Sequence, residues 1–180
     1  AASGYARVSG QVGVCVVTSG PGATNLITAI ASAYMDSIPI VAITGQVRSD
    51  LLGRDVFQEA DITGACEPFT KHSYLVKDTA DLPRVFAEAF HIASTGRPGP
   101  VLIDVPVDIQ QNRLEKVDLC DKIDIIGYKP SVTGHAVQIG RAAEAIAKAR
   151  HPLVCAGGGV FSAKAVDELR VLVENTGIPA

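Results

Sequence analysis

The chain has 180 residues, of which 47% are hydrophobic and 19% charged, with a formal net charge of −3 and an isoelectric point near 5.8. This length suffices for one domain, or for one domain and part of another. The low charge favours extensive buried surface, in a parallel sheet covered on both faces or in an oligomer. The sequence shows no basic patch interleaved with aromatic residues, and its most apolar stretch, residues 26–43, contains Asp36 and Pro39. We therefore expect neither a nucleic-acid partner nor a membrane span.

A tight glycine turn follows the first apolar run of the chain. Residues 1–7 are typical of the end of a helix, residues 12–17 predict a strand, and the apolar spacing over residues 26–35 predicts a helix. Between them lies the turn, residues 18–25 (Thr-Ser-Gly-Pro-Gly-Ala-Thr-Asn). Ligands of parallel sheets bind where strands end, and glycines let the backbone approach a ligand closely. Pro21 suits the first turn of a helix. The turn is thus a candidate ligand site, although an ordinary strand-to-helix turn has the same pattern.

Further strand and helix patterns follow in alternation. Three apolar runs have the length of strands: residues 38–45, 74–76 and 101–105. Residues 46–59 predict a long loop, with a short helix possible after Phe57, and residues 82–93 predict a helix with one apolar face. Alternating strands and helices predict an α/β fold with a doubly wound parallel sheet. We assign residues 1–111 to this domain.

The pattern changes after residue 111. Residues 112–133 mix charges with glycine and proline and predict an interdomain linker. Residues 134–180 predict the start of a second α/β domain. Its expected elements are a helix over 139–147, a strand over 152–156, a turn over 157–159 and a helix over 166–173. We expect the chain to be a piece of a longer polypeptide, because a further strand is due where it stops.

The four cysteines lie far apart, at Cys15, Cys66, Cys120 and Cys155. They form no Cys-x-x-Cys pair and no spacing with histidine that is typical of a metal site, so we predict no metal ligands. Cys15 and Cys155 fall in apolar runs, where cysteine behaves as a small buried hydrophobe. We expect structural thiols in a reducing compartment.

Several segments carry a resemblance to known enzymes. Residues 4–7 (GYAR) and 18–25 (TSGPGATN) resemble the pyrimidine-binding domain of thiamine-diphosphate enzymes. A narrower resemblance, to the large catalytic subunit of acetolactate synthase (acetohydroxyacid synthase), runs along the whole chain in register. Five further segments carry it: 36–39 (DSIP), 43–47 (ITGQV), 55–59 (DVFQE), 70–72 (TKH) and 96–104 (GRPGPVLID).

The resemblance implies a reaction and its cofactors. With thiamine diphosphate and Mg²⁺, pyruvate is decarboxylated and condensed with a second 2-keto acid, giving acetolactate or acetohydroxybutyrate for branched-chain amino acid biosynthesis. The cofactor supplies the difficult chemistry. The resemblance also implies structural FAD, a homodimer or higher oligomer, a possible regulatory subunit, and a cytoplasmic location (organellar in a eukaryote). The activating glutamate and the magnesium site belong to parts of the family outside this chain, so we expect the chain alone to be inactive.

The resemblance assigns cofactor roles to a few residues. Pro21, Gly22 and Asn25 correspond to the turn beside the thiamine ring; a local turn hydrogen bond is the alternative for Asn25. Gly158, in the glycine run 157–159, corresponds to a turn that contacts FAD, but the run also fits any tight turn. Glu67 stands where many family members have an arginine that contacts FAD, and a carboxylate cannot replace a guanidinium.

Other residues are assigned to the substrate pocket. Phe57 and Gln58 correspond to residues that line the pocket of the second keto acid, with Gln58 also near the cofactor; core filling is the alternative for Phe57. Lys71 corresponds to a lysine at the substrate channel, where its charge could attract a carboxylate. The alternative is an exposed surface lysine, and we expect His72 beside it to be structural. Arg48 stands where the family often has proline, at the entrance where herbicides bind.

Two other classes of function remain open. A related 2-keto-acid decarboxylase or glyoxylate carboligase would share the fold and the cofactor. A non-catalytic nucleotide-binding α/β domain would share the strand–turn–helix pattern.

Overall fold

A computed structural model describes residues 1–114, 117 and 123–180. The chain divides into two compact units, Ala1–Pro130 and Ser131–Ala180, which are described separately. Among the described residues, no helix has the length and apolar character needed to cross a lipid bilayer.

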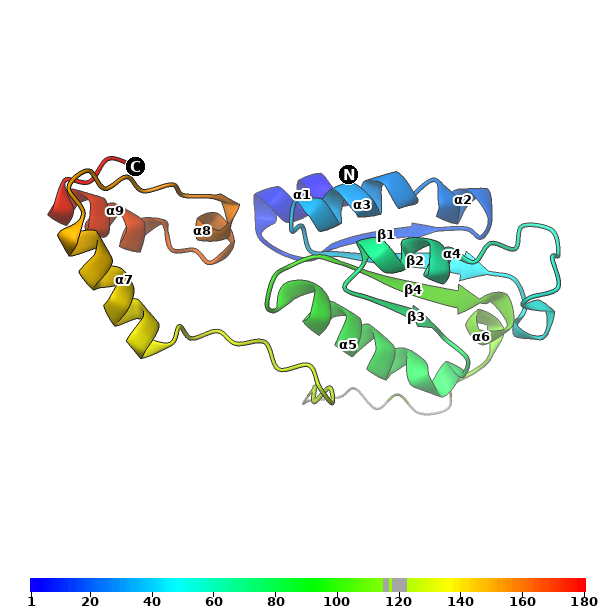
Figure 1. The fold of residues 1–180 in the computed structure, drawn as a ribbon. Helices are drawn as coiled ribbons and strands as arrows, with labels where there is room; N and C mark the ends of the chain where they lie inside the picture. The colour runs from blue at the N-terminus through cyan, green and yellow to red at the C-terminus, as the bar shows by residue number, and fades with distance from the viewer. Residues whose placement is uncertain (115–116, 118–122) are drawn as a thin grey trace. The chain divides into compact units, whose positions relative to one another are not determined.

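The first unit is built on a four-stranded parallel sheet in the order β1-β2-β4-β3 (Figure 1). The strands are β1 (Gly13–Val17), β2 (Ile40–Gln46), β3 (His72–Leu75) and β4 (Pro100–Pro106). The helices are α1 (Ala2–Ser9), α2 (Pro21–Thr24), α3 (Ile27–Met35), α4 (Ile62–Cys66), α5 (Leu82–Ser94) and α6 (Val107–Gln111), with 3₁₀ turns η1 (Ser49–Leu51), η2 (Glu67–Phe69) and η3 (Thr79–Asp81). The predicted α/β class with a parallel sheet is confirmed.

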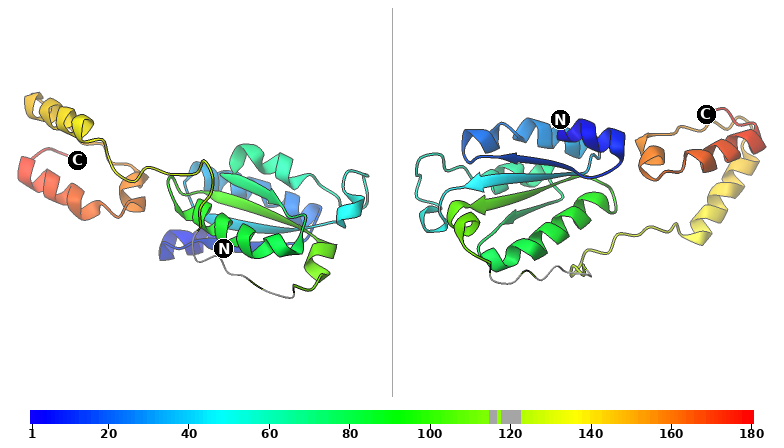
Figure 2. Two further views of the ribbon diagram at one scale, coloured as in Figure 1. Left: turned by 90° about the horizontal axis from the view of Figure 1, so that it is seen from below. Right: turned by 180° about the vertical axis from the view of Figure 1, so that it is seen from behind.

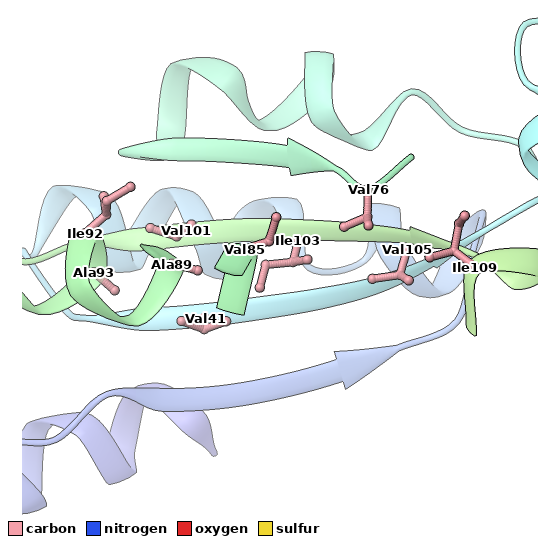
Figure 3. Packing of buried hydrophobic residues seen from close by; sticks show 10 residues of the cluster. All are labelled: Val41, Val76, Val85, Ala89, Ile92, Ala93, Val101, Ile103, Val105 and Ile109. Carbon is pink, nitrogen blue, oxygen red and sulfur yellow. The ribbon is translucent and has the colours of Figure 1, made fainter. Parts of the chain in front are cut away.

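Helix α5 covers one face of the sheet. Every residue of β4 is buried, and alternate side chains of β4 point to opposite faces. Val101, Ile103 and Val105 pack in one cluster with Val41 of β2 and the apolar side of α5. Figure 3 shows this cluster between α5 and the two central strands. Its α5 members recur at helical spacing: Val85, Ala89, Ile92 and Ala93.

The opposite face is covered by the helices that precede and follow β2. Ile30 of α3 and Ile62 of α4 pack in a second cluster with Ala42 and Leu102 of the sheet. Figures 1 and 2 show α1, α2 and α3 on the side of the sheet away from α5. Because both faces are covered, the central strands consist of nearly continuous apolar runs.

Two elements of this unit differ in detail from their prediction. Residues 21–24, predicted as part of the turn, form the short helix α2 with Pro21 at its first position, and the helix predicted over residues 26–35 is α3. The short helix expected after Phe57 is α4, which begins at Ile62. Asp61 caps it, accepting a hydrogen bond from the Gly64 amide at 2.9 Å.

The second unit contains α7 (Ala136–Lys148), α8 (Gly158–Ser162) and α9 (Val166–Thr176). The strand predicted over residues 152–156 is wrong: these residues have no strand conformation in the structure. A strand needs a neighbouring strand for its ladder of hydrogen bonds. Within the described residues this segment gains one backbone contact of that kind, from the Val154 amide to the Pro179 carbonyl at 2.9 Å. The glycine run predicted as a turn leads into α8.

Candidate functional site

A cavity of about 710 Å³ opens where strands β1, β2 and β4 end. Its apolar wall includes Val16 and Ile43 from the strands and Phe86 from α5. Its polar lining includes Ser19 of the glycine turn and Gln110 of α6. The parallel sheet therefore has a hollow at the edge where α/β proteins bind ligands.

The glycine turn beside this cavity requires glycine at its first bend. Gly20 has φ 59° and ψ −121°, close to the values of the first central residue in a type II′ turn. A Cβ atom at Gly20 would lie 2.9 Å from the carbonyl oxygen of Gln58 and 3.0 Å from its Cα. The turn and residue 58, which lie far apart in sequence, are therefore in backbone contact.

Two further glycines allow close packing around the turn. A Cβ at Gly22 would lie 2.7 Å from Cγ2 of Thr18, and one at Gly45 would lie 3.4 Å from the Ser19 amide nitrogen. The end of β2 and the start of α2 thus both press against residues 18–19. The dense packing fixes the shape of the turn.

The segment that reaches this turn is the 47–60 loop, which connects β2 to the Asp61 cap of α4. Gln58 lies in the loop at φ 61°, and Asp55 at φ 53°. Such left-handed conformations are uncommon outside glycine and mark positions that the surrounding structure determines. The side chain of Phe57 is 88% exposed and Gln58 is exposed as well. Core filling by Phe57 is therefore excluded in this structure.

Glu59 holds the middle of the 47–60 loop. Its carboxylate accepts hydrogen bonds from the amides of Gly53 and Val56, the latter at 3.1 Å. These amide donors lower the pKa of the Glu59 carboxyl below its ordinary value. The loop is therefore organised around a charged acceptor rather than around apolar contacts.

Three of the predicted cofactor residues lie in and next to the short helix α2 at this edge. Pro21 and Asn25 are exposed at the two ends of α2, and Gly22 lies between them. The described residues provide no hydrogen-bond partner for the Asn25 side chain, so a local turn bond is not observed. Pro21 and Gly22 directly follow Gly20, the residue against which the Gln58 backbone packs.

Lys71 lies elsewhere, just before β3 and therefore at the amino edge of the sheet. Its ammonium group donates to the carbonyl oxygens of Ile92 and Thr95, the latter at 2.6 Å, and to the Tyr128 hydroxyl at 3.0 Å. It also lies 5.4 Å from the centre of the Tyr128 ring. The lysine is half-buried at the end of α5, and within this chain the structure does not bring it to Phe57 and Gln58. His72, at the start of β3, makes an edge-on contact with the Tyr74 ring.

A buried polar cluster lies beneath the site and was not singled out from the sequence. Asp104 of β4 is 1% exposed, and its carboxylate accepts hydrogen bonds from Thr44 at 2.6 Å and from Gln46 at 2.9 Å. Burial raises the pKa of Asp104 to about 6, and the negative charge of Asp61 adds to this, against the lowering effect of the two hydrogen bonds. The signal in the sequence is an acidic residue inside the apolar run 101–105.

The second unit holds the glycine run that was predicted to contact FAD. Cβ atoms at Gly157, Gly158 and Gly159 would each meet open space, so no close backbone approach demands glycine there. No group of three His, Cys, Asp or Glu side chains with metal-binding geometry occurs in the described parts of the chain.

The cysteines divide by burial. Cys66 is buried and Cys15 is half-buried, and burial raises the pKa of both thiols, as expected for structural cysteines. Cys155 is exposed, against the expectation from its apolar run, because residues 152–156 have no strand neighbour to cover them. The prediction for Cys120 lies outside the described residues.

Two family models match the chain. Residues 1–65 match the N-terminal TPP binding domain of thiamine pyrophosphate enzymes, and residues 139–180 match the central domain of these enzymes. The chain is 58% identical over 179 residues to an acetolactate synthase of Mycobacterium leprae, a match that covers 99% of the chain and 28% of the relative. It is 57% identical to an acetolactate synthase large subunit of Corynebacterium glutamicum, with the same coverage. It is 51% identical over 181 residues to a probable acetolactate synthase large subunit of Methanocaldococcus jannaschii, covering 31% of that protein.

Proposed function

We propose that this chain is part of a thiamine-diphosphate-dependent carboligase, because it is similar to acetolactate synthase large subunits and matches two domain models of thiamine pyrophosphate enzymes. The chain spans between 28% and 31% of the length of these relatives. The proposed reaction decarboxylates pyruvate and condenses it with a second 2-keto acid to acetolactate or acetohydroxybutyrate.

The observation that carries this proposal is the contact between the glycine turn and Gln58 at the carboxyl edge of the sheet. A Cβ at Gly20 would fill the space that the Gln58 backbone occupies. The side chains of Asn25, Phe57 and Gln58 are exposed, and a cavity with an apolar wall opens at the same edge of the sheet. This combination of a rigid backbone wall, an apolar hollow and a few polar groups suits a flat heteroaromatic ring such as the pyrimidine of the cofactor.

Bound thiamine diphosphate supplies the electron sink for decarboxylation of a 2-keto acid. In the proposed site, Pro21, Gly22 and Asn25 would hold its pyrimidine ring. Val16, Ile43 and Phe86 give the cavity at this edge an apolar wall.

The 47–60 loop contributes the groups for the second substrate. The Phe57 ring offers an apolar surface to its alkyl group. The Gln58 amide offers hydrogen-bond donors to its oxygens. Because the backbone of Gln58 is fixed against Gly20, both side chains start from a defined position.

The remaining assignments rest on the resemblance. Mg²⁺ would be held by residues outside this chain, and a homodimer or higher oligomer with a regulatory subunit would complete the enzyme in the cytoplasm. Structural FAD at residues 157–159 is kept as a prediction, and no role in the reaction is assigned to it. The channel role of Lys71 is likewise kept as a prediction, since its ammonium group is already bonded at the end of α5.

Product analysis of the complete enzyme tests the proposal. With pyruvate and thiamine diphosphate we expect acetolactate, and with added 2-ketobutyrate also acetohydroxybutyrate; release of acetaldehyde alone would favour a decarboxylase. Phe57→Ala should raise KM for the second 2-keto acid by about tenfold, because it removes an apolar contact. Ile126→Ala, at a residue that is 99% exposed, is the matched control and should leave the kinetics unchanged.

A further inference from the structure

The side chain of Gln46 joins three parts of the chain at the end of β2. Its amide nitrogen donates to the Asp104 carboxylate at 2.9 Å and to the Ala60 carbonyl at 2.8 Å. Its amide oxygen accepts from the Val47 amide at 2.8 Å. Val47 follows Gln46 directly in the chain and Ala60 is the last residue of the 47–60 loop, so this buried side chain ties the far end of the loop to its start.

Asp104 determines which way the Gln46 amide faces. An ionised carboxylate can only accept hydrogen bonds, so the NH₂ group of Gln46 has to face it. The amide oxygen then has to face away, toward Val47. Within the described residues no ion pair involves Asp104, so hydrogen bonds from Gln46 and Thr44 are what stabilise its buried charge. The charged and titratable groups near it are Asp61 and the Cys66 thiol, both on the α4 side.

We infer that Asp104 is a positioning residue: through Gln46 it closes the ends of the 47–60 loop and thereby places Phe57 and Gln58 at the carboxyl edge of the sheet. The consequence for substrate selection rests on the function proposed above. The effect on the loop does not, because it follows from the hydrogen bonds alone.

Thr44 offers a matched control. It also donates one hydrogen bond to the Asp104 carboxylate, to the other oxygen, but it makes no contact with the 47–60 loop through that bond. Thr44→Val and Gln46→Met therefore each remove one donor from the same buried carboxylate and conserve side-chain size. They differ in whether the connection to the loop is lost.

The experiment measures hydrogen exchange of the loop amides by mass spectrometry in the complete enzyme. Gln46→Met and Asp104→Leu should each accelerate exchange of residues 53–59 by about tenfold, since each removes bonds that hold the loop. Thr44→Val should leave this exchange unchanged. Asp104→Asn should keep the exchange of these amides close to that of the wild type, because the asparagine oxygen can still accept a hydrogen bond from Gln46. Equal effects of Thr44→Val and Gln46→Met, or unchanged exchange in Gln46→Met, would overturn the inference.

Kinetics of the same variants separate the inference from the proposed function. In a carboligase, Gln46→Met should raise KM for the second 2-keto acid by about tenfold, with a smaller effect on consumption of pyruvate alone. If the exchange results hold but wild-type enzyme forms no acetolactate, the proposed function fails and the positioning role stands. If Asp104→Leu does not fold, Gln46→Met and Asp104→Asn still decide the outcome.

Discussion

Replacing Gly20 with alanine tests the contact on which the site is built. The conformation of Gly20, φ 59° and ψ −121°, is strained for any residue with a Cβ, at a cost of about 1–3 kcal/mol. The added Cβ would also lie 2.9 Å from the Gln58 carbonyl oxygen, which is backbone and cannot rotate away. Overpacking of this kind costs about 1–3 kcal/mol. We expect Gly20→Ala to lose about 3 kcal/mol in total, with the 47–60 loop displaced.

Three other glycines separate the two contributions. Gly10 has φ 68° with open space at its Cβ position, so Gly10→Ala measures backbone strain alone. Gly22 has an ordinary φ, but a Cβ there would lie 2.7 Å from Thr18 Cγ2, so Gly22→Ala measures crowding alone. Gly4 lies inside α1 with neither constraint, and Gly4→Ala should stabilise by about 0.5–1 kcal/mol.

Urea denaturation of the complete enzyme and calorimetric titration with thiamine diphosphate are the assays. Gly20→Ala should lose more stability than Gly10→Ala or Gly22→Ala, and Gly4→Ala should be more stable than wild type. Cofactor affinity should fall in Gly20→Ala and be unchanged in Gly10→Ala. A Gly20→Ala enzyme with wild-type midpoint and wild-type affinity would refute the reasoning, because neither the backbone angle nor the contact would then matter.

Three further predictions concern the polar groups. The pKa of Asp104 is about 6 in the folded state, against an ordinary 3.8. Between these two pH values the folded state therefore binds a proton that the unfolded state has released. Stability should therefore fall by about 2 kcal/mol as pH rises from 4 to 7, and urea denaturation of Asp104→Asn should lack this slope; parallel curves would contradict it. Lys71→Met should cost about 1–3 kcal/mol in urea denaturation without changing KM, whereas a raised KM at full stability would favour the channel role. The lowered pKa of Glu59 makes its contribution complete at neutral pH and lost in acid, so Glu59→Gln should speed tryptic cleavage after Arg54 at pH 7; an unchanged rate would refute its role in the loop.

The fold was predictable where a segment alone carries the signal. The run 101–105 is apolar because β4 is covered by helices on both faces, and the period of α5 matches its single buried side. The run 152–156 is apolar as well, but the strand predicted there is absent from the structure. A β-strand forms only when it is hydrogen-bonded to another strand, and the described residues give this segment no neighbouring strand to pair with.

The site was predictable only in part, for a related reason. The glycine turn is local, so its spacing in the sequence was sufficient to find it. The pairing of Gln46 with Asp104 joins residues 58 apart and depends on β4 lying next to β2, which no local pattern specifies. Lys71 lies in a recognisable segment, but its position before β3 places it at the opposite edge of the sheet from Phe57.

The restraints on the 47–60 loop argue that its shape exists before any ligand binds. The Gln46 side chain is hydrogen-bonded to both ends of the loop, and the Glu59 carboxylate accepts hydrogen bonds from amides in its middle. The Gln58 backbone packs against Gly20. A loop of this length without such contacts would lose conformational entropy when it closed on a substrate. Here that entropy is lost during folding, so the binding role proposed for Phe57 and Gln58 would not carry this cost. The positive φ of Gln58 has the same origin, because the surrounding contacts hold the residue in a conformation that it would rarely adopt alone.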